Sequence, residues 1–323
     1  MLTFLVRRLA LALVTTAAVV AITFALVHLA PGEPFVAGAE GRFVPPETVA
    51  RLRERFGLGR PLGVQFARYA INLAQGDLGE SFARHRPVAD VLGEALPNTL
   101  LLGGAALLFS FVLGIGLGIV QAARAGTLTD AALGTIVLAF YSVPAFWLGL
   151  MLLLVFGEWL HWLPVAGMTD AALHGSLSTL GRALDMARHL VLPALTLALV
   201  NAAAVARYHR AAMLEALGAD FVRAARARGL AERRVVLHHA LRSALAPAIT
   251  LAGLSVPALL TGSVLVESVF GWPGMGRVAY EAIFARDYNV ITAVAVVAGV
   301  LVALGNLLAD LGVAAADPRV HRR

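Results

Sequence analysis

The residues of this chain offer little of the chemistry that enzymes use. All 26 positively charged residues are arginine, and cysteine does not occur. Without lysine the chain lacks the phosphate-binding residue of a Walker-type loop and the amine of a Schiff-base enzyme. Without cysteine it lacks thiolate nucleophiles and Cys-based metal ligands, and its histidines and acids do not have metal-ligand spacing. We therefore expect no catalytic residue, no cofactor site and no metal site in this chain.

Polar residues inside the long apolar segments are the remaining candidates for chemistry. In a membrane such residues mark proton or ion pathways, and here they are His28, Asn201, Asn306 and Asp310. His28 lies close to the end of its segment, as an interfacial histidine does. The inverted repeats or paired broken helices of a secondary carrier are not seen in the sequence. The sequence therefore gives little support to an ion-coupled secondary transporter, which is the alternative to the function that the resemblance described below implies.

The apolar segments are long enough to cross a membrane. The 323 residues are 59% hydrophobic and 14% charged, whereas soluble domains are about 45–50% apolar and about 25% charged. Uncharged runs of 18 to 29 residues form about 27–43 Å of helix, which matches a hydrocarbon core of roughly 30 Å. Gly114, Gly116 and Gly118 favour close approach between such helices. We predict an all-α membrane protein with six transmembrane helices: Leu9–Gly32, Ala95–Ala123, Ala131–Gly157, His189–Ala206, Ser243–Val266 and Tyr288–Ala309.

Arginines set the expected orientation, because basic residues stay on the cytoplasmic side of a membrane. With Arg7 and Arg8 inside, the cytoplasmic segments carry 14 arginines and 6 acids, and the external segments carry 12 arginines and 14 acids. Both termini are then cytoplasmic. The positive excess lies mainly in the loop at residues 207–242. Arginines beside anionic lipid account for a pI near 10.6, and no nucleic-acid-binding motif occurs, so we expect no nucleic-acid partner.

The orientation also defines the expected domains. Residues 1–30 form the first transmembrane helix with its cytoplasmic N-terminus, and residues 31–95 form an external (periplasmic) segment, either a cap or a docking surface. Residues 96–313 form a five-helix transmembrane core that includes the loop 207–242, and residues 314–323 form a cytoplasmic tail. The outer end of the fifth span carries residues of a possible external gate or docking face, or alternatively of an interfacial aromatic anchor: Glu267, Phe270, Trp272, Pro273 and Gly274.

The cytoplasmic loop contains a short helix between two glycines. Strong helix formers run from Asp220 to Arg228, and Gly218 and Gly229 mark breaks on either side. On that helix Phe221 lies with Ala224 and Ala225 at i+3 and i+4, so they share one face. An aromatic side chain beside small alanines forms a surface into which another protein can press. The alternative is a solvated, positively charged connector.

The loop contains Ala225-Arg226-Ala227-Arg228-Gly229-Leu230, followed by His239-Ala240-Leu241-Arg242-Ser243-Ala244 and Pro247. This order of residues resembles the loop signature of the dipeptide/oligopeptide/nickel subfamily of bacterial ABC importer permeases. Further markers of that family occur in order along essentially the whole chain: Arg7-Arg8-Leu9, His28-Leu29-Ala30-Pro31-Gly32-Glu33-Pro34, Gly76-Asp77-Leu78-Gly79 with Ser81, Pro97-Asn98-Thr99-Leu100, Ser142-Val143-Pro144-Ala145-Phe146-Trp147, Leu192-Pro193-Ala194, Glu267-Ser268-Val269-Phe270-Gly271-Trp272-Pro273-Gly274-Met275-Gly276, Arg286-Asp287-Tyr288, Asn306 with Asp310, and Pro318-Arg319.

The resemblance implies a type I ABC importer permease fold in the bacterial inner membrane. In that family the loop is a coupling helix seated in a groove of the ATPase subunit. The chain would form half of the pathway for peptides or similar small solutes. Its partners would be a second permease subunit, two ATPases that hold ATP and Mg, an external substrate-binding protein and the lipid bilayer. The implied ATPase contacts are Glu215, Asp220, Phe221, Ala224, Ala225, Arg226, Ala227, Arg228, Gly229 and Leu230.

Three positions depart from the family pattern. Arg223 stands where the broader superfamily's loop has Glu, Glu33 stands where Asp is commoner, and Asp317 stands where Asn is commoner. These changes leave the resemblance intact. Because of them, the substrate of one family member is not assigned to this chain by analogy.

Overall fold

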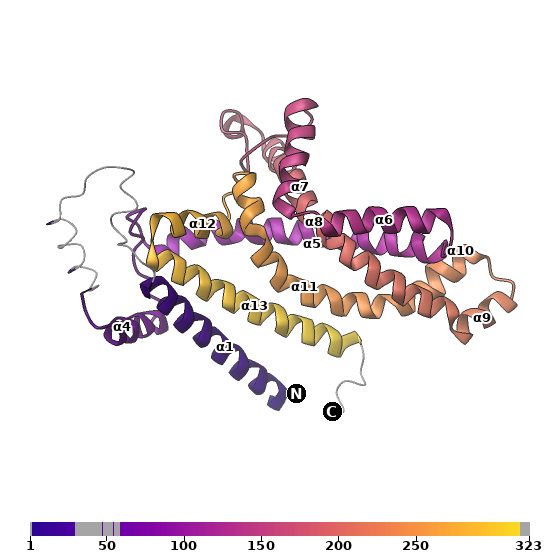
Figure 1. The fold of residues 1–323 in the computed structure, drawn as a ribbon, viewed down its shortest axis with the longest axis horizontal. Helices are drawn as coiled ribbons and strands as arrows, with labels where there is room; N and C mark the ends of the chain where they lie inside the picture. The colour runs from indigo at the N-terminus through magenta and orange to yellow at the C-terminus, as the bar shows by residue number, and fades with distance from the viewer. Residues whose placement is uncertain (1, 30–46, 48–53, 55–58, 317–323) are drawn as a thin grey trace. The chain divides into compact units, whose positions relative to one another are not determined.

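The computed structural model describes residues 2–29, 47, 54 and 59–316 (Figure 1). These residues are almost entirely helical, and the pairing of Glu80 with Pro87 is an isolated antiparallel bridge. The longer helices are α1 (Leu2–Leu29), α4 (Leu62–Ala74), α5 (Val88–Ala123), α6 (Leu128–Ser142), α7 (Ala145–Leu152), α8 (Thr179–Gly218), α9 (Asp220–Ala227), α11 (Leu241–Val269), α12 (Met275–Ala285) and α13 (Tyr288–Ala316). The short ones are η1 (Leu153–Trp159), η2 (His174–Ser176), α10 (Glu232–Arg234) and η3 (Val235–Ala240).

Several of these helices have the length and composition of membrane spans. Within the described ranges, three qualify: Val88–Ala123, Thr179–Gly218 and Tyr288–Leu307. The bent pair Leu128–Ser142 and Ala145–Trp159 would make a fourth, and Leu13–Leu29 is a shorter apolar helix. The all-α membrane fold is therefore confirmed. The count of six spans and the cytoplasmic location of the termini stay predictions, and the tail at 317–323 lies outside the described residues.

The third expected span is not one straight helix. The uncharged run from Ala131 to Gly157 predicts a single span, but α6 and the following α7–η1 segment are bent by 105°. Val143 and Pro144 between them have extended backbones, with ψ angles of 131° and 132°. The proline ring disfavours the helical conformation of the residue before it, so the helix ends there. This segment is a broken span or a re-entrant loop.

The chain divides into two compact units. The first contains Met1–Thr99 and Pro273–Ala303, and the second contains Leu100–Trp272 and Leu304–Arg323. This division follows contacts within the chain, whereas the expected domains follow the membrane and stay a prediction. A buried cluster in the first unit joins the start of α5 to α12 and the start of α13: Val88, Val91, Leu92, Ala95, Met275, Val278, Ala282, Val290 and Ala293.

In the second unit the long helix α8 lies against α6, α7 and α11 (Figure 1). It also lies close to α5 at two glycines. A Cβ atom on Gly114 would lie 2.5 Å from the Val205 side chain, and one on Gly118 would lie 3.0 Å from the Ala206 carbonyl. The third glycine, Gly116, has open space around it. The expected close approach between helices is therefore made by the two glycines spaced four residues apart.

Candidate functional site

The short helix α9 follows directly on the C-terminal end of α8. Helix α8 ends at Gly218, the extended residue Ala219 turns the chain, and α9 runs from Asp220 to Ala227. The acidic Asp220 lies in the first turn, where a negative charge favours the helix dipole. The helix expected over Asp220–Arg228 therefore forms, one residue shorter at its C-terminal end.

A glycine ends α9 in the way that the sequence predicts. Gly229 has a φ of +76°, which L-residues with a Cβ rarely adopt. Its amide donates to the Arg226 carbonyl over 2.9 Å, and the Leu230 amide donates to the Ala225 carbonyl over 3.4 Å. These two bonds form a Schellman motif, which satisfies the last carbonyls of the helix. The half-buried Leu230 packs on the same cluster as Ala225, so the turn fixes both the end of α9 and the path that follows.

The inner face of α9 is anchored inside the chain. Val222 and Ala225, three residues apart, are both fully buried. They belong to a cluster that joins the ends of α5 and α8 to η3 and the start of α11: Ala122, Met213, Ala216, Val222, Ala225, Val235, Val236, Ala240 and Ala244. Burying a valine side chain of this kind stabilises by about 1.5–3 kcal/mol. Apolar packing therefore sets the position of α9 against α8.

The outer face of α9 differs from the face that the sequence indicates. Phe221 is 45% exposed, and Ala224, Ala227 and Arg228 are exposed as well. Ala225, expected beside Phe221 and Ala224 on one docking face, points inward instead because it lies in the stripe defined by Val222. The outward surface is an aromatic ring beside small side chains and arginine, which suits contact with another protein.

Polar contacts hold α9 to the segments before and after it. The Arg226 guanidinium donates to both Glu232 oxygens, over 3.1 Å and 2.7 Å, and to the Leu217 carbonyl over 3.5 Å. These hydrogen bonds lower the pKa of Glu232 and raise that of Arg226. Arg226, expected as a partner contact, is thus used within this chain. On the exposed side Arg223 pairs with Asp220, and Glu215 on α8 is exposed. The sequence analysis did not name Val222 or Glu232 as important. Val222 lies three residues before Ala225, and Glu232 lies six residues after Arg226, so their spacing was a usable signal.

The residues of the expected external gate fall in two places. In the second unit Glu267, Phe270 and Trp272 are buried, at 0%, 2% and 0% exposure. The Trp272 amide donates to the Glu267 carbonyl over 2.8 Å. Trp272 is therefore a core side chain and not an exposed interfacial anchor. In the first unit the Pro273 carbonyl accepts from the Asn98 amide group over 2.9 Å, and Gly274 is the N-cap residue of α12.

Two sequence markers meet in the first unit. The Ser81 hydroxyl lies 2.5 Å from Asp287 Oδ2, and the Ala83 amide donates to the same oxygen over 3.1 Å. The Asn289 amide group donates to the Glu80 carbonyl over 2.8 Å. These hydrogen bonds therefore join the Gly76–Ser81 turn to the Arg286–Tyr288 segment, although the two are about 200 residues apart in sequence. Nothing in the local sequence indicates this pairing.

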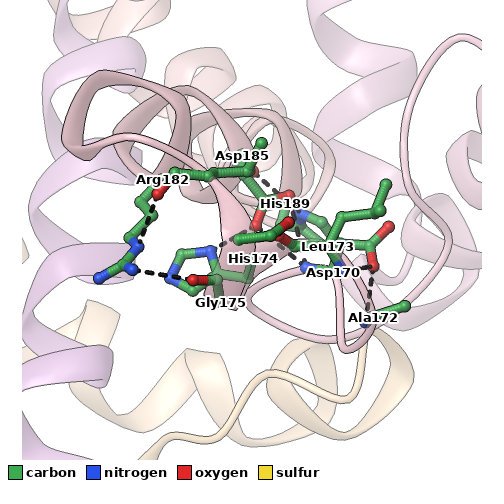
Figure 2. A network of polar contacts seen from close by, with 10 residues as sticks. Asp170, Ala172, Leu173, His174, Gly175, Arg182, Asp185 and His189 are labelled. Atoms are coloured by element: carbon green, nitrogen blue, oxygen red, sulfur yellow. Dashed lines mark hydrogen bonds and ion pairs between the residues drawn. The ribbon is translucent and has the colours of Figure 1, made fainter.

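A polar network binds the loop before α8 to the first turns of that helix (Figure 2). His174 Nδ1 lies 2.6 Å from Asp185 Oδ2, and His189 Nδ1 lies 3.2 Å from the other carboxylate oxygen. The Asp170 amide donates to Asp185 Oδ2 over 3.1 Å. Arg182 donates to two loop carbonyls, at Gly175 and Leu177. Across the described residues, no group of three or more His, Cys, Asp or Glu could hold a metal ion.

The candidates for a proton pathway are used locally or lie outside the described side chains. His28 Nδ1 lies 2.9 Å from the Phe24 carbonyl, and its ring stacks on Phe24 at 3.9 Å between centroids. The Asn201 side chain donates to the Leu197 carbonyl over 2.8 Å. The side chain of Asp310 lies outside the described residues. His28 and Asn201 therefore form hydrogen bonds with backbone carbonyls of their own helices. Among the described side chains, these candidates form no hydrogen-bonded pathway across the helices.

An all-α fold with several long apolar helices is that of a membrane protein. Residues 114–322 match the family described as binding-protein-dependent transport system inner membrane component, and residues 1–103 match its N-terminal counterpart. The chain belongs to this family, as the resemblance of its motifs predicts. It is accordingly a multi-pass inner-membrane permease component of an ABC importer, and the ion-coupled alternative is disfavoured.

Relatives with known names agree with this assignment. The chain is 42% identical to the di/tripeptide transport system permease protein DppB of Pseudomonas aeruginosa strain UCBPP-PA14, over 100% of both chains. It is 35% identical to the oligopeptide transport system permease protein AppB of Bacillus subtilis strain 168, over 98% of this chain and 99% of that protein. A chain of the inward-facing MetNI methionine ABC transporter has a similar fold, with a TM-score of 0.56 and 21% identity, over 70% of this chain and 96% of that one.

Proposed function

We propose that this chain forms half of the translocation pathway of an importer for dipeptides or short oligopeptides. The names of its relatives support this substrate class, since DppB and AppB are peptide permeases that match along almost their whole length. The second half of the pathway is a homologous permease subunit. Two ATPase subunits bind ATP and Mg, and an external binding protein delivers the peptide. The chain crosses the membrane six times with both termini in the cytoplasm.

In this proposal α9 is the contact with an ATPase subunit. The supporting observation is the division of its two faces, because Val222 and Ala225 fix the helix on α8 while Phe221 and Ala224 face outward. A helix held in this way moves as one piece with the end of α8. Closure of the ATPases on ATP would therefore displace α8 through α9, and the bundle would change between two arrangements. Glu215, Arg228 and Gly229 border the same contact.

The test is a charge on the outward face of α9. In the complex reconstituted in proteoliposomes, Phe221→Asp should lower uptake of radiolabelled L-alanyl-L-alanine by roughly tenfold or more, as loss of an interface hot spot does. Because Phe221 is 45% exposed, the variant should insert normally. Arg223→Ala, on the opposite flank of the same helix, is the matched control and should keep most uptake. Normal uptake by Phe221→Asp would contradict the docking assignment of α9.

A further inference from the structure

Outside α9 and its anchor, the second unit contains an ion pair that joins two helices far apart in sequence. Arg210 on α8 donates to both oxygens of Asp130 on α6, over 2.9 Å and 2.8 Å. Asp130 is 8% exposed, and the side chain of Arg210 is 35% exposed. The Gly126 amide donates to the Asp130 carboxylate as well, over 3.1 Å. Bidentate contacts between arginine and a carboxylate fix geometry as well as adding energy.

The turn between α5 and α6 is built to hold Asp130 in place. The Thr127 hydroxyl accepts from the Asp130 amide at the start of α6 and donates to the Arg124 carbonyl over 2.7 Å. Gly126, whose amide reaches the carboxylate, has a φ of +79°. The carboxylate therefore receives three donors from two sides, from α8 and from the turn. Its orientation does not depend on Arg210 alone.

The pair lies between α9 and the bend that follows α6. Arg210 precedes the end of α8 at Gly218 by eight residues, about 12 Å of uninterrupted helix. Asp130 lies at the start of α6, whose far end is the 105° bend at Val143 and Pro144. Near the pair, α8 packs on α6 and on α5 through small side chains, and Gly118 would have no room for a Cβ beside the Arg210 backbone.

One side of the pair is open. A groove of about 550 Å³ runs beside it, lined by Gln121, Gly134, Leu138 and Arg207 among others. On this side the start of α6 is held to α8 by the ion pair. Further along α6, Val137 packs on Ala203 and Ala206 of α8, so the ion pair adds to close packing and fixes the orientation of the first turn of α6.

We infer that Asp130 and Arg210 are positioning residues that make α6, and with it the bent segment α6–α7, follow a displacement of α9. The inference rests on the proposed function, because it needs a partner that moves α9. The path has three rigid steps. Val222 and Ala225 hold α9 to α8, α8 is continuous from Arg210 to Gly218, and the bidentate pair holds α8 to α6. Removing either charge leaves α9 in place but loosens the first turn of α6 from α8, so that α6 follows a displacement of α9 less closely.

The experiment measures how much peptide is taken up per ATP hydrolysed. The complex containing Asp130→Asn or Arg210→Gln is reconstituted in proteoliposomes, and L-alanyl-L-alanine uptake and ATP hydrolysis are measured together. We expect assembly and basal ATP hydrolysis, without the binding protein, to persist while uptake per ATP falls roughly fivefold or more, the usual size of a coupling between sites. Arg124→Gln, an exposed arginine in the same turn, is the control and should change nothing.

The possible outcomes separate the inference from the proposed function. Assembled single variants with an unchanged ratio of uptake to hydrolysis would overturn the inference. If the single variants fail to assemble, Asp130→Glu and Arg210→Lys keep both charges but disturb the bidentate geometry, and a normal ratio in these would overturn it equally. If the unmodified complex takes up no L-alanyl-L-alanine, the proposed substrate is wrong. The pair is then tested by the stimulation of ATP hydrolysis on adding the binding protein, which should fall in the single variants.

Discussion

The two ends of α8 are attached to their neighbours by different physical means. At the N-terminal end Asp185 of α8 holds the preceding loop through His174 and the Asp170 amide, and His189 of α8 lies beside the same carboxylate. At the C-terminal end α9 is held by the buried side chains of Val222 and Ala225 and by a glycine turn. Polar attachment depends on the orientation and charge of a few groups, whereas apolar attachment depends on the fit of many.

This difference indicates which end can transmit force. An apolar anchor holds α9 in one position whatever the local charge, so a partner that moves α9 also moves α8. Next to the other end, Leu163 and Met168 of the loop pack on a buried cluster, but the contact of the loop with the first turns of α8 is made by a few hydrogen-bonded groups around Asp185. We therefore expect disturbances at the C-terminal end to affect transport, and disturbances at the N-terminal end to stay local.

The largest effect is expected at the turn that ends α9. Gly229→Pro forces φ to about −65° where the structure has +76°, and it removes the amide that donates to Arg226. We expect α9 to lose its last turn and peptide uptake to fall at least roughly tenfold. Uptake in proteoliposomes measures this, together with hydrogen exchange over residues 220–230.

A matched variant separates backbone strain from the loss of glycine itself. Gly229→Asn keeps the amide, and asparagine tolerates positive φ better than other residues with a Cβ. No atom lies within 4 Å of a Cβ at this position. This variant should keep most uptake. If it is as defective as Gly229→Pro, the backbone conformation is not the reason for the defect.

A local effect is expected at the other end of α8. Asp185→Asn removes the charge that His174 and His189 share and weakens the hydrogen bond from the Asp170 amide. Hydrogen exchange in the preceding loop should speed up on the order of tenfold, the effect of leaving such partners unsatisfied. Exchange in α9 should not change. Glu158→Gln, an exposed acid near the same loop, is the control. Faster exchange in α9 would show that the two ends are not independent.

The sequence was informative where a feature is local. Apolar length gives the helical membrane fold, and glycines at 218 and 229 give the bounds of α9 to within one residue. Pro144 indicates the position of the 105° bend. A straight span was nevertheless predicted, because the residues on both sides of Pro144 are uncharged over a long run. The local conformational rule for the residue before proline was the better guide at that position.

Features that depend on distant segments could not be predicted from a single sequence. Ala225 and Ala224 are chemically identical neighbours, and only packing by α5 and η3 makes one buried and the other exposed. Asp130 and Arg210 are 80 positions apart, and Ser81 and Asp287 are 206 apart. Each of these four residues is of a polar type that is equally common on an exposed surface. Their pairing is a property of the tertiary fold.

The smallest effect is expected where the apolar end of α8 has its own ion pair. Arg226 lowers the pKa of Glu232 below its ordinary value, so the pair contributes fully above that ordinary value and is lost as pH falls through the lowered one. Both side chains are largely exposed, and such pairs contribute little. Acidification through that range should speed exchange in α9 at most a few-fold. Glu232→Gln should remove the pH dependence and leave the helix formed. A collapse of α9 in that variant would mean that charge, and not the burial of Val222 and Ala225, holds this end together.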